Sequence, residues 1–354
     1  MSTRRKAVVE SPDLSSLRLL AAPMEARSAE TLPNEPGEWQ FEPKWDGFRC
    51  LAIREGGDVE LKGKSGTSLS RFFPEVVATL RDVPFEQFVV DGELVIELNG
   101  RMTFDALQAR LHPAARRIRR LSLETPARLI LFDMLMGPDG SPVGALPLTK
   151  RRGVLESFGE KAAIAGKLIV TPCTRDLAKA TQWLDDFDRD GRDGVVAKRL
   201  NEKYLSGERA MIKVKRLRTA DCVVGGFRYQ SGSLEVGSLL LGLYNAQGLL
   251  DHVGFTSTIA NDERPALTRK LHALQAQPGF TGRAPGGPSR WSTERSGDWK
   301  PLRPEMVVEV RYDQVTSDRF RHGTKLLRFR PDKPPRQCSI DQIIAPPRAL
   351  PADE

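Results

Sequence analysis

The sequence predicts an α+β domain followed by a small all-β domain, with the boundary close to residue 217. Before that residue, strand-like runs are interleaved with amphipathic helical segments, as in an α+β unit. After it, short strand-like runs recur between glycine-rich turns with one helical segment among them, as in a small closed barrel. The length of 354 residues is enough for two or three domains with buried cores.

The elements before the boundary follow from hydrophobic periodicity and turn residues. Two hairpins are expected, the first from Trp39 with its turn at 56–58 and the second from Gln87 with its turn at 98–100. A continuous apolar run, ARLILFDML, indicates a buried strand. Helices are expected at 104–111, 149–160 and 176–188, the last two opened by a capping-type residue, and the strands GVVAKR and MIKVK follow.

The segment after the boundary has the pattern of an OB-fold barrel. Its strands are expected within DCVVGGFRYQ, SLLLGLYNAQG, LLDHVGFTST and MVVEVRYDQVTS, interrupted by a helix at 265–277 and a Pro/Gly-rich loop at 278–297. We divide the chain into a flexible basic arm, the α+β domain, the barrel and a flexible tail, at residues 1–20, 21–217, 218–345 and 346–354.

Composition narrows the classes of function. The net charge of +8 fits a polyanion partner such as nucleic acid, but it fits a merely soluble basic protein equally well. The four cysteines are scattered, so we expect neither a zinc knuckle nor a disulfide framework, and we expect a reducing compartment. The N-terminus lacks the apolar stretch of a secretory signal, and no run is long enough to span a membrane. We expect a cytoplasmic protein.

Lys44 lies on a predicted strand, two residues before an Asp-Gly turn. Taken alone, it is best explained as a surface lysine running into a hairpin. A nucleophilic role requires loss of a proton, which burial or nearby cations promote. Such cations occur at Lys198 in DGVVAK and at Lys213 and Lys215, which share one strand face in IKVK. Four amines in one core-like pocket would repel one another unless they bound a polyphosphate, which points to a nucleotide.

Carboxylates in apolar strands complete this pattern. Candidates are Asp91 and Glu93 in VVDGELVI and Asp193 in DGVVAK. Phosphoryl transfer uses Mg²⁺, whose preferred protein ligands are carboxylate oxygens. The alternative role for Glu93 is a structural salt bridge.

Segments spanning residues 42–333 resemble, in order, the motifs of the covalent nucleotidyltransferases, the superfamily of DNA ligases, RNA ligases and mRNA capping enzymes. They are KWDGFR, LKGKSG with RFFP, VVDGELVI, LILFDML, DGVVAK, IKVK and RPDK. KWDGFR, DGVVAKR and RPDKPPRQC are most similar to ATP-dependent DNA ligases of the bacterial stand-alone LigC type. The resemblance implies a nucleotidyltransferase domain, that is, an ATP-grasp-like ligase adenylation domain, followed by an all-β OB-fold domain.

The resemblance also implies a role for each matching residue. Lys44 becomes the lysine that carries AMP, with Asp46 in the same catalytic motif. The other nucleotide contacts implied are Glu42 by the adenine amino group, Phe132 on the base, Arg49 and Glu93 at the ribose, Lys198, Lys213 and Lys215 at the phosphates, and Arg330, Asp332 and Lys333 at the departing pyrophosphate. The implied metal ligands are Glu93 and Asp193, and the implied DNA contacts are Lys64 and Arg71.

Two residues depart from the family's pattern. Asp193 stands where glutamate is common, so its carboxylate reaches one methylene less far toward a metal. Lys64 stands where arginine is usual, which removes bidentate phosphate recognition. Lys64 and Arg71 fit solvated turn residues as well as they fit contacts to the nick phosphate. The arginines within 116–120 fit either a solvated helix face or a DNA-backbone contact.

The implied reaction seals 3′-OH/5′-phosphate nicks in duplex DNA through lysyl-AMP and then DNA-adenylate, in DNA repair. ATP and Mg²⁺ are its expected cofactors, with Mn²⁺ as a substitute. We expect a monomer at the bacterial nucleoid, recruited by repair proteins. An NAD-dependent ligase is disfavoured, because too few residues precede Lys44 for a nicotinamide domain and the cysteines are scattered. A capping guanylyltransferase, an RNA ligase and a non-catalytic nucleic-acid-binding barrel remain alternatives.

Overall fold

The protein is described from a computed structural model, which covers residues 22–162, 166–186, 192–215, 217–286 and 298–344. The predicted arm at 1–20 and tail at 346–354 lie outside these residues. The chain divides into two compact units, Met1–Arg216 and Leu217–Glu354, and each is described by itself. None of the described helices combines the length and the apolar character needed to cross a membrane.

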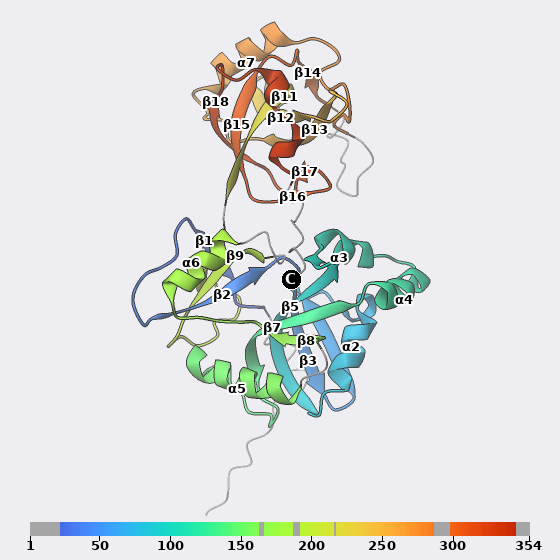
Figure 1. The fold of residues 1–354 in the computed structure, drawn as a ribbon, viewed down its shortest axis with the longest axis vertical. Helices are drawn as coiled ribbons and strands as arrows, with labels where there is room; N and C mark the ends of the chain where they lie inside the picture. Colours follow the sequence, from blue (N-terminus) through green and yellow to red (C-terminus); the bar gives the residue numbers. More distant parts are fainter. Residues whose placement is uncertain (1–21, 163–165, 187–191, 216, 287–297, 345–354) are drawn as a thin grey trace, which may run out of the picture. The chain divides into compact units, whose positions relative to one another are not determined.

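Two β-sheets form the first unit (Figure 1). The smaller sheet has the order β1-β10-β9-β2, with bounds Ala26–Ala29, Met211–Val214, Arg192–Arg199 and Trp39–Trp45. The larger has the order β4-β3-β5-β7-β8, with bounds Asp58–Gly63, Phe48–Glu55, Gln87–Leu98, Ala127–Met136 and Leu168–Val170, and β6 (Arg101–Met102) pairs with β5. The pairs β1–β10 and β7–β8 are parallel and the others are antiparallel.

The chain crosses from one sheet to the other between β2 and β3. The strand-like run that starts at Trp39 contains the predicted Asp-Gly turn, and the structure breaks the run there, at Asp46-Gly47. β2 pairs with β9, whereas β3 pairs with β4 and β5. A Cβ atom at Gly47 would collide with the carbonyl oxygen of Leu94, so glycine is required where the backbone makes this close approach.

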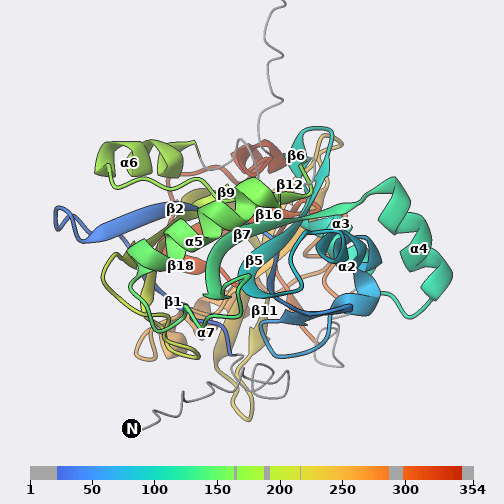
Figure 2. The same ribbon diagram turned by 90° about the horizontal axis from the view of Figure 1, so that it is seen from below.

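Helices cover both sheets of this unit (Figure 2). α2 (Pro74–Arg81), α3 (Phe104–Arg110) and α5 (Leu148–Lys161) pack apolar side chains against the larger sheet. α6 (Leu177–Asp185) packs on β2 and β9. α4 (Ala115–Glu124) packs on α2, and a short 3-10 helix, η1 (Ser70–Phe72), precedes α2.

The predicted helices are present as α3, α5 and α6, although residues 187–188 lie outside the described part of the chain. α6 starts at a capping residue, Asp176, whose side chain accepts a hydrogen bond from the backbone N–H of Ala178 at 2.8 Å. The capping expected at Thr149 is wrong, because α5 begins after Pro147 without a side-chain cap. α2 was not predicted, since its short apolar pattern is hard to distinguish from a strand.

The second unit is an antiparallel sheet in the order β13-β12-β11-β15-β18, with bounds Leu250–Thr256, Val236–Tyr244, Arg218–Tyr229, Val307–Tyr312 and Lys325–Phe329. A bridge between Thr256 and Thr324 connects its two outer edges, as in a barrel. α7 (Arg264–Leu274) covers one side and ends three residues before the predicted Gln277. The small elements are β14 (Lys300–Pro301), β16 (Val315–Thr316), β17 (Arg319–Phe320), η3 (Pro335–Gln337) and η4 (Ile340–Gln342).

Candidate active site

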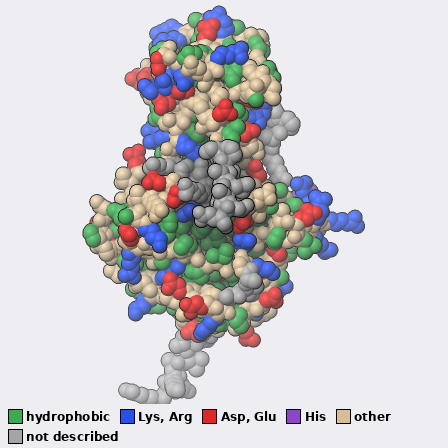
Figure 3. Space-filling model, viewed as in Figure 1, with side chains coloured by type: hydrophobic (Ala, Val, Ile, Leu, Met, Phe, Trp, Pro, Cys, Tyr) green, Lys and Arg blue, Asp and Glu red, His purple; other side chains and the backbone are tan. Residues whose placement is uncertain are grey.

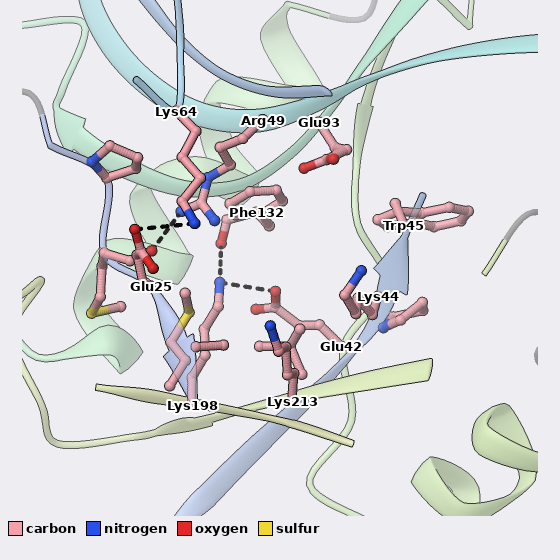
Figure 4. A pocket seen from close by; sticks show the side chains of 16 residues that line it. Glu25, Glu42, Lys44, Trp45, Arg49, Lys64, Glu93, Phe132, Lys198 and Lys213 are labelled. Atoms are coloured by element: carbon pink, nitrogen blue, oxygen red, sulfur yellow. Dashed lines mark hydrogen bonds and ion pairs between the residues drawn. The ribbon is translucent and has the colours of Figure 1, made fainter. Parts of the chain in front are cut away.

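A cavity of about 240 Å³ opens between the two sheets of the first unit (Figure 4). The smaller sheet contributes residues of β2, β9 and β10, and the larger sheet contributes residues of β3, β5 and β7. The segment 23–26 and Lys64 complete its walls. The predicted site residues that line it are Glu42, Lys44, Arg49, Lys64, Glu93, Phe132, Lys198 and Lys213.

Lys44 lies at the end of β2, where its ammonium faces this cavity. Its Nζ is 2.7 Å from Oδ2 of Asp193, and the same oxygen is 2.8 Å from Nζ of Lys215. Asp193 is 5% exposed whereas Lys44 is 23% exposed, so one buried carboxylate holds two accessible ammonium groups. Lys215 is not among the lining residues and reaches the site through Asp193. Lys44 must give up a proton before it can act as a nucleophile.

Lys198 is the most deeply buried lysine of the cluster, at 4% exposure. Its Nζ is 2.9 Å from Oε2 of Glu42 and donates a hydrogen bond to the backbone carbonyl of Phe132 at 2.8 Å. Glu42 is itself held by Gln40, whose Nε2 donates to Oε1 at 2.8 Å. Since a buried ion pair is stable only when its polar atoms are satisfied, this network fixes one wall of the cavity.

The side chain of Phe132 lies close to two cationic groups. The Arg49 guanidinium is 4.6 Å and the Lys198 ammonium 4.9 Å from its ring centroid. Both distances are within the range of cation–π attraction. The ring is therefore held on the cavity wall, where a planar base could pack against it.

Arg49 is anchored by Asp91. Its Nε and Nη2 donate to the two carboxylate oxygens of Asp91 at 2.6 and 2.5 Å. Asp91 also accepts from the Tyr204 hydroxyl at 2.6 Å, and that hydroxyl accepts from the backbone N–H of Met24 at 2.8 Å. Burial, and after it the charge of Asp91, raises the pKa of Tyr204 well above its ordinary value, so the hydroxyl remains a donor.

This network holds the segment 23–26 against the cavity, and sequence reasoning missed it. Arg49 also donates to the carbonyl oxygen of Met24 at 3.1 Å. The available signal was Asp91, which we considered as a metal ligand, because a carboxylate in an apolar strand needs partners. Its partners are Arg49 and Tyr204, so the position of Asp91 is explained without a metal. No motif marked Met24 or Tyr204.

Glu93 faces the cavity from β5. Burial raises the pKa of its carboxyl from the ordinary value of 4.5 to about 7, against the opposing charges of Lys44 and Arg49. No hydrogen bond or ion pair to Glu93 is made within the described residues 22–162, 166–186, 192–215, 217–286 and 298–344. A half-buried carboxylate that faces the cavity in this way is suited to a cation or a sugar hydroxyl that arrives with the ligand.

The raised pKa of Glu93 predicts a pH-dependent stability. The folded chain holds a proton that the unfolded chain releases between pH 4.5 and about 7, so the stabilising contribution is complete below that interval and is lost as the pH rises through about 7. Thermal unfolding of the ligand-free protein should therefore show a midpoint that falls, relative to that of Glu93→Gln, between pH 4.5 and about pH 7. The control is Glu97→Gln, which removes a carboxylate from the same strand in a half-exposed pair with Arg128. Parallel curves for wild type and Glu93→Gln would contradict the prediction.

Lys213 and Lys64 are the remaining lysines that line the cavity. Burial, followed by the charges of Lys44, Lys215 and Lys64, lowers the pKa of Lys213, which shows that these ammonium groups lie near one another. Lys64 is 63% exposed, and its Nζ is 3.1 Å from Oε1 of Glu25.

The residues that line the cavity do not include five other predicted residues: Asp46, Arg71, Arg330, Asp332 and Lys333. Asp46 is half-buried between β2 and β3, and it is not a lining residue. Arg71 lies in η1, where it donates to the carbonyl oxygen of Pro113 at 3.2 Å. In the second unit, Arg330 pairs with Asp332 at 2.8 Å and with Asp221 at 2.9 Å, and Nζ of Lys333 is 3.7 Å from Asp221.

A metal ion is not enclosed by protein ligands alone. In the part of the chain that the structure describes, no three His, Cys, Asp or Glu side chains gather into a metal cluster. Glu93 lines the cavity and Asp193 borders it through Lys44. One or two carboxylates completed by phosphate oxygens and water are what Mg²⁺ uses in phosphoryl-transfer sites, so these residues fit such an ion.

Comparisons with known proteins agree with this arrangement. The family described as "ATP dependent DNA ligase domain" matches residues 18–215, and "ATP dependent DNA ligase C terminal region" matches residues 232–333. DNA ligase C1 of Mycolicibacterium smegmatis is 41% identical over 333 residues, covering 92% of this chain and 94% of the relative. DNA ligase C of Mycobacterium tuberculosis is 40% identical over 340 residues, covering 92% and 94%. A solved Lig E DNA ligase structure has a TM-score of 0.55 at 17% identity, covering 88% of this chain and 100% of that chain, and shows the fold.

A lysine-lined cavity in an α+β domain, followed by a β-barrel, defines a nucleotidyltransferase with a C-terminal OB-fold. The chain belongs to the ATP-dependent DNA ligases. This confirms the predicted fold class, the enzymatic activity of DNA ligation and the dependence on ATP. The predicted similarity to the ligase C type is confirmed at 40–41% identity.

Proposed function

We propose that this ligase seals nicks in duplex DNA through a covalent AMP on Lys44. The observation that carries the proposal is the position of this lysine, which faces a cavity between two sheets and pairs with Asp193 at 2.7 Å. The Nζ lone pair of Lys44 attacks the α-phosphorus of ATP. A nitrogen–phosphorus bond forms, the bond to pyrophosphate breaks, and Asp193 lies in place to accept the proton that Nζ gives up.

Catalysis of this step rests on positioning and on charge neutralisation. In the proposal, Glu42 and Phe132 lie at the base, Arg49 and Glu93 at the ribose, and Lys198, Lys213 and Lys215 at the phosphates. The contacts within the cavity leave donors for these roles. Lys198 uses its ammonium for Glu42 and for one carbonyl, and Arg49 uses two of its three guanidinium nitrogens. An ammonium has three N–H donors and a guanidinium has five.

In the same proposal, Glu93 and Asp193 would bind a Mg²⁺ ion, or Mn²⁺ in its place. When bound, such an ion offsets negative charge on the phosphates. Support comes from the carboxylate of Glu93, which no described side chain satisfies, and from the position of Asp193 beside Lys44.

The later steps would transfer AMP to the 5′-phosphate of the nick and then join the 3′-hydroxyl to that phosphate with release of AMP. Lys64 and Arg71 would contact the DNA. The proposal divides the protein into a first domain at 21–217 and a second domain at 218–345. From the second domain, Arg330, Asp332 and Lys333 would act on pyrophosphate. Asp46 would act within the Lys44 motif. Lys64 at the cavity mouth supports its part of this proposal.

We also expect a monomer that repair proteins recruit at the nucleoid. A repair role is supported by a relative at 27% identity, "Multifunctional non-homologous end joining DNA repair protein LigD" of Mycobacterium tuberculosis. This chain covers 39% of that protein.

Incubation with α-labelled ATP or α-labelled GTP, each with Mg²⁺, tests the proposed chemistry. The wild-type protein, freed of any bound AMP beforehand, should take up label from ATP, and a chase with nicked duplex DNA should remove that label as the nick closes. Uptake from GTP alone would indicate a capping-type guanylyltransferase. No uptake from either nucleotide would eliminate the lysyl-AMP route and leave a non-catalytic barrel as the better description.

A further inference from the structure

Helix α4 (Ala115–Glu124) carries an arginine surface that the proposed chemistry does not use. Ile118 and Ser122 are its buried residues, and the opposite side is exposed to solvent. At 3.6 residues per turn, the exposed side collects four arginines, which we call the α4 ridge: Arg116, Arg117, Arg119 and Arg120. Figure 3 shows blue side chains gathered at the edge of the domain where Figure 1 places α4.

The arginines of the α4 ridge occupy positions where a helix disfavours positive charge. Arg116 and Arg117 lie in the first turn, where the helix dipole disfavours cations, and that turn has neither an acidic residue nor a side-chain cap. Like charges three and four residues apart also repel each other. Within the described residues, Arg120 alone of the four has an ion pair, to Glu124 at 3.5 Å. The helix therefore presents concentrated charge that the domain itself does not neutralise.

The α4 ridge is also held in place by a buried residue. Arg110, at the end of α3, has no exposed surface, and its guanidinium donates to the carbonyl oxygens of Thr125 at 3.3 Å and Phe72 at 2.8 Å and to Glu75 at 2.8 Å. Thr125 is the C-cap of α4 and Phe72 ends η1, so Arg110 connects the end of α4 to η1 and α2. A long buried side chain with this many partners holds α4, η1 and α2 rigidly together.

Helix α3 and η1 also connect the α4 ridge to β3, the strand that follows Lys44. Phe48, the first residue of β3, packs edge-on against Phe104 of α3 with ring centroids 5.3 Å apart. Arg71 of η1 donates to the carbonyl oxygen of Pro113, in the turn that leads into α4. Arg71, a proposed DNA contact, and the α4 ridge are thus held by the same group of packed elements, α2, α3 and η1.

We propose that the α4 ridge binds the sugar-phosphate backbone of duplex DNA away from the nick. Guanidinium groups match phosphate geometry, and four of them displace condensed counterions without reading sequence. An acidic protein is the other polyanion that such a surface could hold. DNA is favoured because the chain belongs to the DNA ligases and because Arg71, a proposed DNA contact, is bonded to the turn that leads into α4. The inference rests on the proposed function, in that the bound duplex is the one being sealed.

The test compares two variants with equal loss of charge. The ridge variant is R116Q/R117Q/R119Q/R120Q, in which glutamine preserves helix propensity. The control variant is K150Q/K161Q/K167Q/R175Q, whose four side chains are exposed around α5 and the start of α6, and Figures 1 and 2 both show α4 well apart from α5 and α6. Binding to nicked and to intact duplex is measured over a range of salt concentrations, and label uptake from ATP is measured alongside.

The ridge variant should bind both duplexes at least about tenfold more weakly at low salt, and the slope of log affinity against log salt should fall by about two to four. The control variant should show a smaller change, and both should take up label from ATP at the wild-type rate. An unchanged salt slope for the ridge variant would overturn the proposal and favour an acidic protein as the partner. A loss confined to nicked DNA would also overturn it, because a backbone contact away from the nick must serve both duplexes. Failure of the wild-type protein to take up label would instead count against the lysyl-AMP chemistry.

Discussion

Replacing Lys44 by arginine is expected to abolish transfer of label from α-labelled ATP to the protein. Arginine retains the positive charge that pairs with Asp193, but its guanidinium stays protonated and has no lone pair to attack phosphorus. The loss should be about 10⁴-fold or more, as for other enzymes deprived of their nucleophile. The measurement is the rate of label uptake in a single turnover.

Two further measurements separate this chemical loss from a folding defect. Lys150→Arg, on the exposed side of α5, is the matched substitution and should leave the rate unchanged. Lys44→Ala should still seal a nick that already carries AMP, since no bond to Lys44 forms in that last step. Label uptake by either Lys44 variant at a rate near that of the wild type would show that another residue is the nucleophile.

The parts of this site that sequence could predict are those encoded within short segments. Strand periodicity placed Lys44 on β2 and Lys198 on β9, and register then brings them to neighbouring strands, because Gln40 faces Lys198 and Pro43 faces Val195. Both lysines line the same cavity. A local pattern of alternating residues is enough for such an inference, because antiparallel pairing fixes which side chains share a face.

The missed parts depend on contacts between segments far apart in the chain. The wall formed by segment 23–26 exists because β1 pairs in parallel with β10, so that Ala26 lies beside Met211. Tyr204 reaches both Met24 and Asp91 from a loop between β9 and β10. Neither residue belongs to a periodic run, and a single tyrosine in a loop carries no signal of its partner.

The break at Asp46-Gly47 illustrates a different limit. The Asp-Gly pair indicates a turn, but nothing in the alternating residues on either side shows that β2 and β3 belong to different sheets. What decides the outcome is the close approach of the Gly47 backbone to Leu94, which appears only when β5 is in place. This tertiary constraint directs Lys44 toward one wall of the cavity and Arg49 toward the other.

Replacing Asp193 by alanine is expected to slow adenylation by about 10²- to 10³-fold, which is the usual cost of removing one preorganised electrostatic group from an active site. The buried carboxylate holds Lys44 at 2.7 Å and Lys215 at 2.8 Å. Without it, two ammonium groups repel each other, and Lys44 loses both its orientation and its nearest proton acceptor. Glu38→Ala, which removes a carboxylate from the exposed pair with Arg199, is the control and should have little effect.

The choice of replacement separates the role of Asp193 in orienting Lys44 from its role as a metal ligand. Asp193→Asn keeps an oxygen that can accept from Lys44 but removes the charge, so a purely orienting role predicts partial activity at an unchanged metal requirement. A role at the metal predicts instead that Asp193→Asn needs a higher Mg²⁺ concentration for half-maximal label uptake. Asp193→Glu restores the residue common in the family, and its extra methylene should preserve charge while moving the carboxylate relative to Lys44. Because each rate is measured across a Mg²⁺ titration, a wild-type rate and metal requirement for Asp193→Ala would refute both roles together.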